Sequence, residues 1–298
     1  MLGRIVTALV LIPVVVALVW WAPSAVVAGV LAIVLLLTLH EFFDLGAPEY
    51  TTGGMQIRSR GLRPFRAWTA ACAVLLIFAQ WSAGQFEVPP LHYGVEIIRN
   101  RVYWNVSLDM FLVIFAFGCM AIALGSRMGL ADLLSGSGVS SAALLLIVLP
   151  ASFLVRLHQI PVTGPRWVLF VLVLVWAGDM AAFFIGKALG RTKLAPLLSP
   201  KKTWEGAAAN VAASLLVGYL FAQWLPVTVS QMLVLAALAS VAGQCGDLME
   251  SAWKRGAQVK DSSSLLPGHG GMLDRIDSLI FATPVVWYYV DWLFRNRS

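Results

Sequence analysis

Charge is scarce in this sequence. Asp, Glu, Lys and Arg make up 12% of its 298 residues, whereas they make up about a quarter of an average soluble protein. None of them occurs from Ile5 to Leu39 or from Gly206 to Gly246. Each of these stretches is long enough for two membrane spans of about 20 residues, divided at Pro23 and at Pro226. The shortage of charge therefore excludes an ordinary soluble domain and predicts a polytopic membrane protein with two tight helical hairpins.

Cysteine is scarce too. The chain has three cysteines, and they show no CxxC spacing of the kind found in metal and redox sites. Cys72 and Cys119 lie inside apolar stretches, so we expect small buried side chains rather than disulfides or zinc ligands. No internal repeat, low-complexity tract or soluble domain stands out in the sequence.

Further apolar stretches predict the rest of a helical bundle. They cover approximately residues 65–81, 109–124, 142–155, 167–185 and 278–293. Each is longer than the ~10 residues of a barrel strand, and lipid offers the backbone no hydrogen bonds, so helices are the expected spanning element. We therefore predict an all-α fold, a polytopic transmembrane helical bundle of about nine spans.

Basic residues predict the orientation of this bundle. Most of them fall in three connections, which contain Arg58, Arg60, Arg63 and Arg66; Lys187, Arg191, Lys193, Lys201 and Lys202; and Lys254, Arg255, Lys260 and Arg275. The opposite side would hold Arg156, Arg166, Arg295 and Arg297. With nine spans the three connections share one side, and an excess of Lys and Arg marks the cytoplasmic side. Because no transit peptide is recognisable, we expect a bacterial inner membrane.

The net charge of +6 fits orientation and the binding of anionic lipid or phosphate, and we expect no nucleic-acid partner. Unusual polar residues are concentrated in the C-terminal half. Residues 1–165 are chemically plain, and we expect them to form a lipid-facing scaffold of transmembrane helices. Residues 166–298 are expected to form a catalytic region with cytoplasmic loops at 187–206 and 250–277. Three polar clusters in this region are candidates for a functional site.

The first cluster surrounds Asp179, which lies near the end of an apolar stretch. An acid in a span is costly unless it faces water or a cation. Asp179 and Lys187 fall along one helical face together with Gly186 and Gly190, so both side chains can line one cleft, and the glycines permit close approach of another helix. The plain alternative for Lys187 is snorkelling to the membrane surface.

The second cluster directly precedes a predicted helix and reads Ser199-Pro200-Lys201-Lys202-Thr203-Trp204-Glu205-Gly206. Thr203 can cap the helix, and Glu205 suits its first turn. Lysines, a hydroxyl and backbone amides at a helix N-terminus are suited to binding phosphate. The spacing is not that of a Walker loop, and a capped helix start on the cytoplasmic side explains the segment equally well.

The third cluster begins where the long uncharged stretch ends. One helical face carries Asp247, Glu250, Ser251 and Lys254. Lys260-Asp261 and Gly268-His269-Gly270-Gly271 follow, then Asp274-Arg275-Ile276-Asp277. The glycines allow backbone amides to curl around an anion. Several carboxylates beside many cations suggest a hard divalent metal, and the lack of histidine ligands makes zinc a poor fit.

These clusters resemble the C-terminal signature of the integral-membrane phosphatidate cytidylyltransferases, also called CDP-diacylglycerol synthases. That signature, Ser-x-apolar-Lys-Arg-x4-Lys-Asp and then His-Gly-Gly-x-x-Asp-Arg-x-Asp, is matched from Ser251 to Asp277, with Trp253 where an aliphatic residue or Phe is usual. The upstream pattern of the family is matched by Asp179, Ala182, Gly186, Ser199, Pro200, Lys202, Thr203, Glu205 and Gly206. Phe183 replaces the usual Tyr, so any hydrogen bond of that hydroxyl is missing or supplied elsewhere. Before residue 165 the resemblance rests on span layout and a loose match at Glu41.

The resemblance implies transfer of a cytidylyl group from CTP to phosphatidic acid, giving CDP-diacylglycerol and pyrophosphate. A lipid phosphate is already a competent nucleophile, so such a site must align it with the α-phosphorus and neutralise charge. The resemblance also implies Mg²⁺, with room for a second cation, held among Asp247, Asp261, Asp274 and Asp277.

The other candidate residues fall into two groups. The catalytic candidates are Asp247, Lys254, Lys260, Asp261, His269 and Arg275. The substrate-binding candidates are Asp179, Lys187, Ser199, Lys201, Lys202, Thr203, Glu205, Ser251, Arg255, Gly270 and Gly271. For His269 we favour an orienting or phosphate-binding role over that of a base, because the lipid phosphate is largely ionised near neutral pH.

Other readings stay open at this point. The chain fits a transferase acting on another membrane lipid, a catalytically inactive relative, or an ion-coupled transporter with Asp179 and Asp247 near span ends. Against transport, the polar groups crowd one membrane face. Membrane lipids are expected partners, and an odd helix count is compatible with a homodimer. In the N-terminal half, Glu41 at the base of a hairpin is a candidate for supporting the site.

Overall fold

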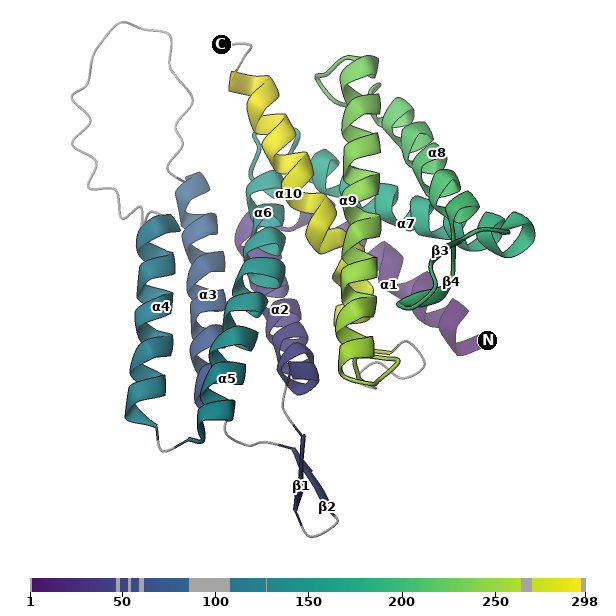
Figure 1. Ribbon diagram of the computed structural model, residues 1–298. Coiled ribbons are helices and arrows are strands. Elements are labelled where there is room, and N and C mark those ends of the chain that lie inside the picture. The colour runs from purple at the N-terminus through teal and green to yellow at the C-terminus, as the bar shows by residue number, and fades with distance from the viewer. Residues whose placement is uncertain are drawn as a thin grey trace, which may run out of the picture.

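Helices dominate the structure, a computed structural model that describes residues 2–46, 49–52, 55–58, 62–85, 108–126, 128–263 and 270–295. The helices (Figure 1) are α1 (Leu2–Trp21), α2 (Ser24–Gly46), α3 (Arg63–Gln85), α4 (Leu108–Gly125), α5 (Leu130–Ala143), α6 (Leu149–His158), α7 (Gly164–Leu189), α8 (Trp204–Phe221), α9 (Val229–Gly256) and α10 (Leu273–Arg295). A π-helical turn over Leu144–Val148 joins α5 to α6, so the two form one continuous rod. The all-α prediction is confirmed.

Only one of the two predicted hairpins forms: α8 and α9 pack along each other on either side of the short connection that contains Pro226. The chain also turns at Pro23, directly after α1 ends at Trp21, but α1 packs against α7 rather than along α2, so the predicted hairpin at Pro23 is wrong. Thr228 caps α9, since its hydroxyl accepts a hydrogen bond from the backbone N–H of Gln231 at 3.3 Å. The Gln231 side chain in turn accepts from the backbone N–H of Thr228 at 3.0 Å. This reciprocal capping box satisfies two donors at the helix end.

Two short β-hairpins lie outside the bundle, and the helical pattern did not predict them. They pair β1 (Glu49–Thr52) with β2 (Met55–Arg58), and β3 (Lys193–Ala195) with β4 (Ser199–Thr203). In Figure 1 the first extends beyond the helix ends and the second lies beside the start of α8. Both hairpins fall in basic connections, where the chain has too few apolar residues to continue a span.

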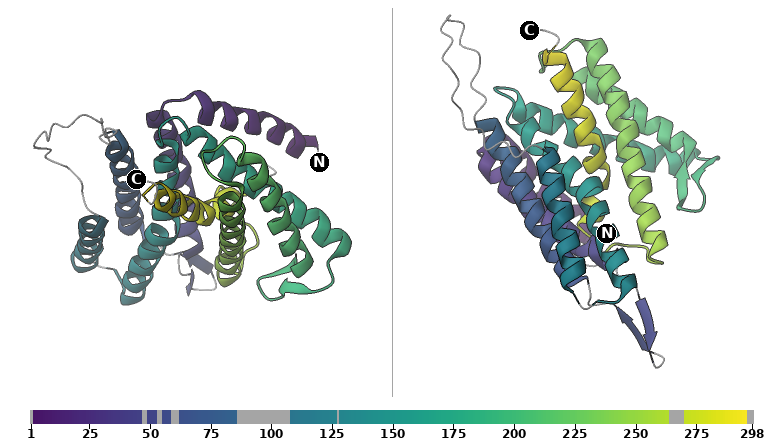
Figure 2. Two further views of the ribbon diagram at one scale, coloured as in Figure 1. Left: turned by 90° about the horizontal axis from the view of Figure 1, so that it is seen from above. Right: turned by 60° about the vertical axis from the view of Figure 1, so that its left-hand side comes forward.

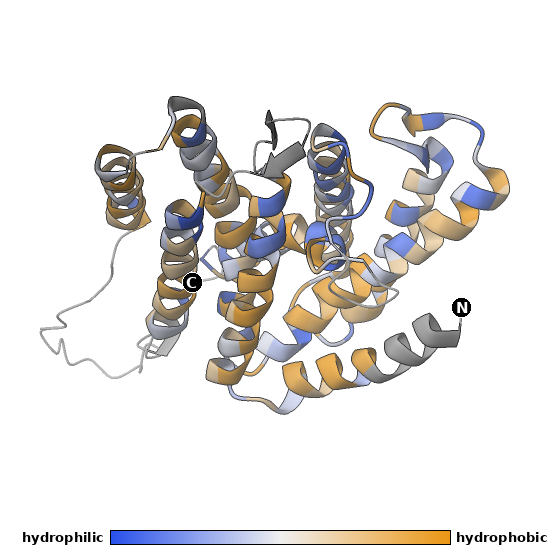
Figure 3. Ribbon diagram, turned by 90° about the horizontal axis from the view of Figure 1, so that it is seen from below, coloured by the Kyte–Doolittle hydropathy of each residue, from blue (hydrophilic) through white to orange (hydrophobic). Residues whose placement is uncertain are grey.

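Six helices among the described residues are long and apolar enough to cross a membrane. They cover Ser24–Gly46, Arg63–Ala83, Leu108–Gly125, Asp132–His158, Gly164–Leu189 and Val229–Gly256. In α1 only Leu11–Trp21 stands out as a shorter apolar helix. Orange apolar stretches run along most of the helices in Figure 3. The integral-membrane class is therefore confirmed, while about nine spans is more than this structure supports.

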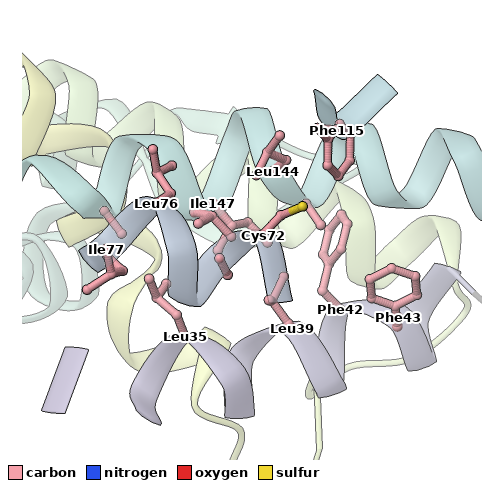
Figure 4. Packing of buried hydrophobic residues seen from close by; sticks show 14 of the residues in the cluster. Leu35, Leu39, Phe42, Phe43, Cys72, Leu76, Ile77, Phe115, Leu144 and Ile147 are labelled. Atoms are coloured by element: carbon pink, nitrogen blue, oxygen red, sulfur yellow. The ribbon is translucent and has the colours of Figure 1, made fainter. Parts of the chain in front are cut away.

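The interior consists of two apolar clusters that α10 joins. One cluster packs α2, α3, α4 and the α5–α6 rod together, and Figure 4 shows among its members Leu35, Leu39, Phe43, Leu144 and Ile147. The other packs α1, α7, α9 and α10 around fully buried Trp167, Phe170 and Met232. Ile280 of α10 belongs to the first cluster and Val286 to the second. Cys72 and Cys119 are buried free thiols, as expected.

Helix neighbours bring the polar clusters together. α7 packs along α8, α8 along α9 and α9 along α10, and the views of Figure 2 show this group together with α1 lying against α7. The C-terminal part of α9 and the β1–β2 hairpin lie toward the same end of the molecule in Figure 1, whereas the α8–α9 turn and the end of α10 lie toward the other. The polar clusters on α7, β4–α8, α9 and α10 can therefore meet at one site.

Candidate active site

A cavity of about 870 Å³ lies between α7, α8, α9 and the first turn of α10. Predicted site residues that line it are Asp179, Lys187, Lys201, Lys202, Thr203, Asp247, Lys254, Asp274 and Asp277. It is also lined by Lys193, Asn210, Gln244 and Glu250, which were not among the predicted site residues. The three sequence clusters thus contribute to one cavity that is rich in both lysine and carboxylate side chains.

Close packing of α7 and α8 shapes one wall of the cavity. A Cβ on Gly206 would lie 2.9 Å from the carbonyl oxygen of Ala182 and 3.3 Å from the Cα of Gly186. A Cβ on Gly178 would lie 2.5 Å from Oδ1 of Asn210. Because these positions carry only hydrogen, the two backbones approach closely, which brings Asp179 of α7 to the residues at the start of α8.

The start of α8 is held by caps. The Thr203 hydroxyl accepts a hydrogen bond from the backbone N–H of Gly206 at 3.1 Å, as expected for an N-cap. The Glu205 carboxylate accepts from the backbone N–H of Thr192 at 3.1 Å. Hydrogen bonds from its own backbone N–H and from Thr192 and Arg191 hold the pKa of Glu205 below its ordinary value. Glu205 therefore fixes the β3–β4 hairpin to α8 and does not line the cavity.

Three carboxylates converge on one point of the cavity. One oxygen each from Asp247, Glu250 and Asp277 lies within 4.8 Å of the other two. Anionic oxygens this close repel one another unless a cation or a proton lies between them, and oxygen ligands are what Mg²⁺ and Ca²⁺ prefer. The donor set therefore fits a hard divalent cation. Of the predicted metal ligands, Asp247 and Asp277 belong to this group, and Glu250 joins them.

The other two predicted metal ligands, Asp274 and Asp261, do not belong to this group of three carboxylates. Asp274 accepts hydrogen bonds from Nζ of Lys254 at 2.6 Å and from the backbone N–H of Gly271 at 2.9 Å. Burial alone would raise the pKa of Asp274, but the hydrogen bonds from Lys254 and Gly271 outweigh burial and hold that pKa below its ordinary value. Asp261 is exposed on the segment after α9 and does not line the cavity.

Lysines neutralise the cavity carboxylates. Nζ of Lys202 lies 2.5 Å from Oδ2 of Asp247. Nζ of Lys254 lies 2.6 Å from both Oε2 of Glu250 and Oδ1 of Asp274, and its side chain is only 13% exposed. These pairs keep both signs of charge at the cavity wall. The same ammonium groups are suited to binding phosphate oxygens when a phosphorylated ligand enters.

Asn210 is a cavity residue that the sequence reasoning missed. It is 5% exposed, and its Nδ2 donates to Oδ1 of Asp179 at 3.3 Å. Its Oδ1 accepts from the hydroxyl of Ser240 at 2.8 Å, and Gln244 donates to that hydroxyl at 3.3 Å. A signal was present, because amide side chains inside an uncharged apolar stretch are expensive in a membrane and call for a partner.

Several predicted residues do not line the cavity. Arg255 donates to the backbone carbonyls of Leu198 and Val259 at 3.2 and 2.9 Å, so it ties the β3–β4 hairpin to the segment after α9. Ser251 is buried, while Lys260 and Arg275 are exposed. The predicted residues outside the cavity lining are Ser199, Glu205, Ser251, Arg255, Lys260, Asp261, Gly270, Gly271 and Arg275. His269 lies outside the described residues.

Comparison with known proteins identifies relatives of this chain. The chain is 36% identical over 286 residues to a phosphatidate cytidylyltransferase of Pseudomonas aeruginosa, covering 95% of this chain and 94% of the relative. It is 39% identical over 138 residues to one of Bacillus subtilis, and 42% identical over 135 residues to one of Haemophilus influenzae. These two matches cover 46% and 43% of this chain, and 51% and 47% of the relatives, so the chain spans about half the length of those relatives.

The family assignment rests on nearly the whole chain. Residues 2–293 match the sequence profile described as the cytidylyltransferase family, and the Pseudomonas aeruginosa alignment is similarly complete. Both findings include the N-terminal helices as well as the cavity. The chain therefore belongs to the cytidylyltransferase family.

Proposed function

We propose that this protein transfers the cytidylyl group of CTP to phosphatidic acid, forming CDP-diacylglycerol and releasing pyrophosphate. The observation that carries the proposal is the cavity, which sets the carboxylates of Asp247, Glu250 and Asp277 beside the ammonium groups of Lys202 and Lys254. Nucleotidyl transfer requires both a cation site and donors for phosphate oxygens. The family and the names of the relatives support the same reaction.

The chemistry needs positioning more than proton transfer. An oxygen of the lipid phosphate attacks the α-phosphorus of CTP, a new P–O bond forms, and the bond between the α-phosphorus and the bridging oxygen breaks to release pyrophosphate. The attacking oxygen is already anionic near neutral pH, so a general base is unnecessary. The protein must hold the two phosphates in line and offset their charge.

Charged residues of the cavity divide this work. Lys187, Lys193, Lys201 and Lys202 lie on the α7 and α8 side, where they would bind phosphate oxygens. Asp247, Glu250 and Asp277 would hold a divalent cation, which we propose to be Mg²⁺ with room for a second cation. When bound, it would neutralise the triphosphate and stabilise the leaving pyrophosphate. Asp274 keeps Lys254 in place between two carboxylates.

Residues beyond the cavity lining would act at its rim. We propose that Lys260, Asp261, His269 and Arg275 contact substrate phosphates or metal only once substrate is bound, because apo geometry is often looser than that of the substrate complex. The same applies to Ser199, Ser251, Arg255, Gly270 and Gly271. We further propose residues 1–165 as scaffold and 166–298 as the catalytic region, a cytoplasmic site in a bacterial inner membrane, and a homodimer as the assembly.

The first test is conversion of radiolabelled CTP and phosphatidic acid by purified protein in detergent, with Mg²⁺ or with EDTA. We expect metal-dependent CDP-diacylglycerol, and at least ~100-fold less of it from Asp247→Asn, since that change removes a charged ligand from the cation group. Asp291→Asn is the matched control, because Asp291 pairs with Arg295 near the end of α10. Product from another lipid but none from phosphatidic acid would assign a different acceptor, and no product from a folded protein would indicate an inactive relative.

A further inference from the structure

The carboxylate of Glu41 in α2 is surrounded by donors from the segments next to α10. Its Oε1 accepts from the hydroxyl of Ser263 at 2.6 Å and from the backbone N–H of Met272 at 2.8 Å. Its Oε2 accepts from the hydroxyl of Ser262 at 2.9 Å and from the backbone N–H of Leu273 at 2.9 Å. Each oxygen thus receives one hydroxyl and one backbone amide.

This arrangement is built around a negative charge. Glu41 is 2% exposed, and none of the ion pairs formed by the described residues includes it. Leu273 is the first residue of α10, and an anion at a helix N-terminus is stabilised by the unpaired amides and the helix dipole. A hydroxyl can turn to donate or accept, but a backbone N–H only donates. Replacing Glu41 by glutamine would therefore set the side-chain NH₂ group against a backbone N–H, and neither of these two groups can accept a hydrogen bond.

The held segment carries a cavity residue. The backbone N–H and the hydroxyl of Ser262 lie 3.3 and 3.1 Å from Oδ2 of Asp274, and the N–H of Gly271 lies 2.9 Å from the same oxygen. Oδ1 of Asp274 accepts from Lys254 at 2.6 Å. Glu41 and Asp274 therefore share Ser262, and a connected series of hydrogen bonds leads from α2 to the lysine in the cavity wall.

Packing fixes this connection tightly. A Cβ on Gly271 would lie 1.8 Å from the Ser262 hydroxyl oxygen and 2.5 Å from Oε2 of Glu41, so a side chain at this position would displace both groups. Next to Glu41, the ring of Phe42 meets the ring of Trp253 edge-on with centroids 4.9 Å apart. The last turns of α2 thus contact both the end of α9 and the beginning of α10.

We propose that Glu41 is a positioning residue for the reaction, which it serves by holding residues 262–263 and 271–273 so that Asp274 faces Lys254. The inference rests on the proposed cytidylyl transfer for its effect on rate, but not for its effect on structure. It gives the N-terminal half a direct part in arranging the site. Supporting residues of this kind are worth about 10- to 100-fold in activity.

The test compares Glu41→Gln with Asp44→Asn in purified protein. Asp44 lies about one turn further along α2, where it pairs with Arg66 of α3 at 2.5 Å. Hydrogen exchange of a peptide covering residues 270–276 reports on the structure without any substrate. Ser263→Ala, which removes one donor only, tests the same contact if Glu41→Gln folds poorly. Steady-state kinetics with CTP and phosphatidic acid report on the reaction.

We expect faster exchange of this peptide in Glu41→Gln, with kcat lowered about 10- to 100-fold and the Mg²⁺ concentration for half-maximal rate raised. Ser263→Ala should change the exchange rate, kcat and the Mg²⁺ requirement in the same directions but by smaller amounts. Asp44→Asn should match the parent protein in all three measurements. Unchanged exchange, unchanged kcat despite faster exchange, or an equal loss in Asp44→Asn would overturn the proposal. If the parent protein shows no transfer, the proposed function fails, and the exchange measurement alone decides whether Glu41 holds the segment.

Discussion

Single residues in this cavity combine burial with full charge. Lys254 has a 13% exposed side chain between Glu250, 2% exposed, and Asp274, 12% exposed. Removing one partner of such a group leaves an uncompensated buried charge, which is more costly than removing both. Asn210 is held in a comparable way by Asp179 and Ser240. The site residues therefore contribute to stability as well as to binding.

Lys254→Met should separate these two contributions. The change leaves the carboxyl groups of Glu250 and Asp274 buried without their cation, so we expect a loss of about 3–5 kcal/mol in unfolding free energy and loss of transferase activity. Adding Asp274→Asn removes one of these two carboxylates and should recover part of the stability without recovering activity. Thermal unfolding in detergent and turnover of CTP are the two measurements. A single variant as stable and as active as the parent protein would contradict this account.

Among the elements, α7 and α8 decide the shape of the cavity. Their close packing depends on Gly206, because a Cβ at this position would lie 2.9 Å from the carbonyl oxygen of Ala182. Interior packing of this density transmits a change in one helix to its neighbour. The β3–β4 hairpin is fixed to the same place through Glu205 and Thr192. A substitution at this contact should therefore displace the side chain of Asp179 and the lysine side chains of the β3–β4 hairpin.

Gly206→Ala tests the contact directly. Because backbone atoms must shift to accept the methyl group, we expect about 1–3 kcal/mol of destabilisation and reduced turnover. The control is Gly29→Ala in α2, where nothing lies within 4 Å of the added Cβ. There the methyl group should be neutral or should stabilise the helix by up to about 1 kcal/mol. Equal melting temperatures for the two variants would show that α7 and α8 do not need this spacing.

For the whole molecule, the central question is which side of the membrane the cavity faces. α9 has 28 residues and is therefore about 42 Å long, enough to cross a bilayer from Val229 to Gly256. The cavity lies toward its C-terminal end, where Asp247, Glu250 and Lys254 are found. The excess of basic residues in the nearby connections favours the cytoplasm.

Cysteine labelling at the two ends of α9 tests this orientation. Cys245→Ala first removes the exposed natural cysteine. A new cysteine is then introduced at one of two exposed positions, as Ser230→Cys or as Gly256→Cys, and each protein is reacted with a membrane-impermeant maleimide. We expect labelling of the first in intact bacterial cells and of the second only after the membrane is opened. The reverse pattern would place the cavity outside the cell, away from CTP.

Features that depend on local composition could be predicted from the amino-acid sequence. Long uncharged stretches indicated the membrane class and the hairpin at Pro226, because apolar length is a property of consecutive residues. The hairpin expected at Pro23 does not form, because α1 packs against α7, and a sequence stretch does not specify which helix a span packs on. Spacing along one helix likewise predicted that Asp247 and Lys254 share a face. Counting apolar stretches overestimated the number of spans. Helical periodicity did not predict the two β-hairpins, because it carries no information about extended pairing in polar connections.

The packing of the helices determines which residues meet when they are distant in the sequence. It selected Glu250 rather than Asp261 for the carboxylate group, paired Asp274 with Lys254, and brought Asn210 to Asp179. It also brought Glu41 to the start of α10, across most of the chain. The physical reason is that a buried charge needs partners from whichever helices pack beside it, and helix packing depends on the shapes of whole surfaces rather than on neighbouring residues in the sequence.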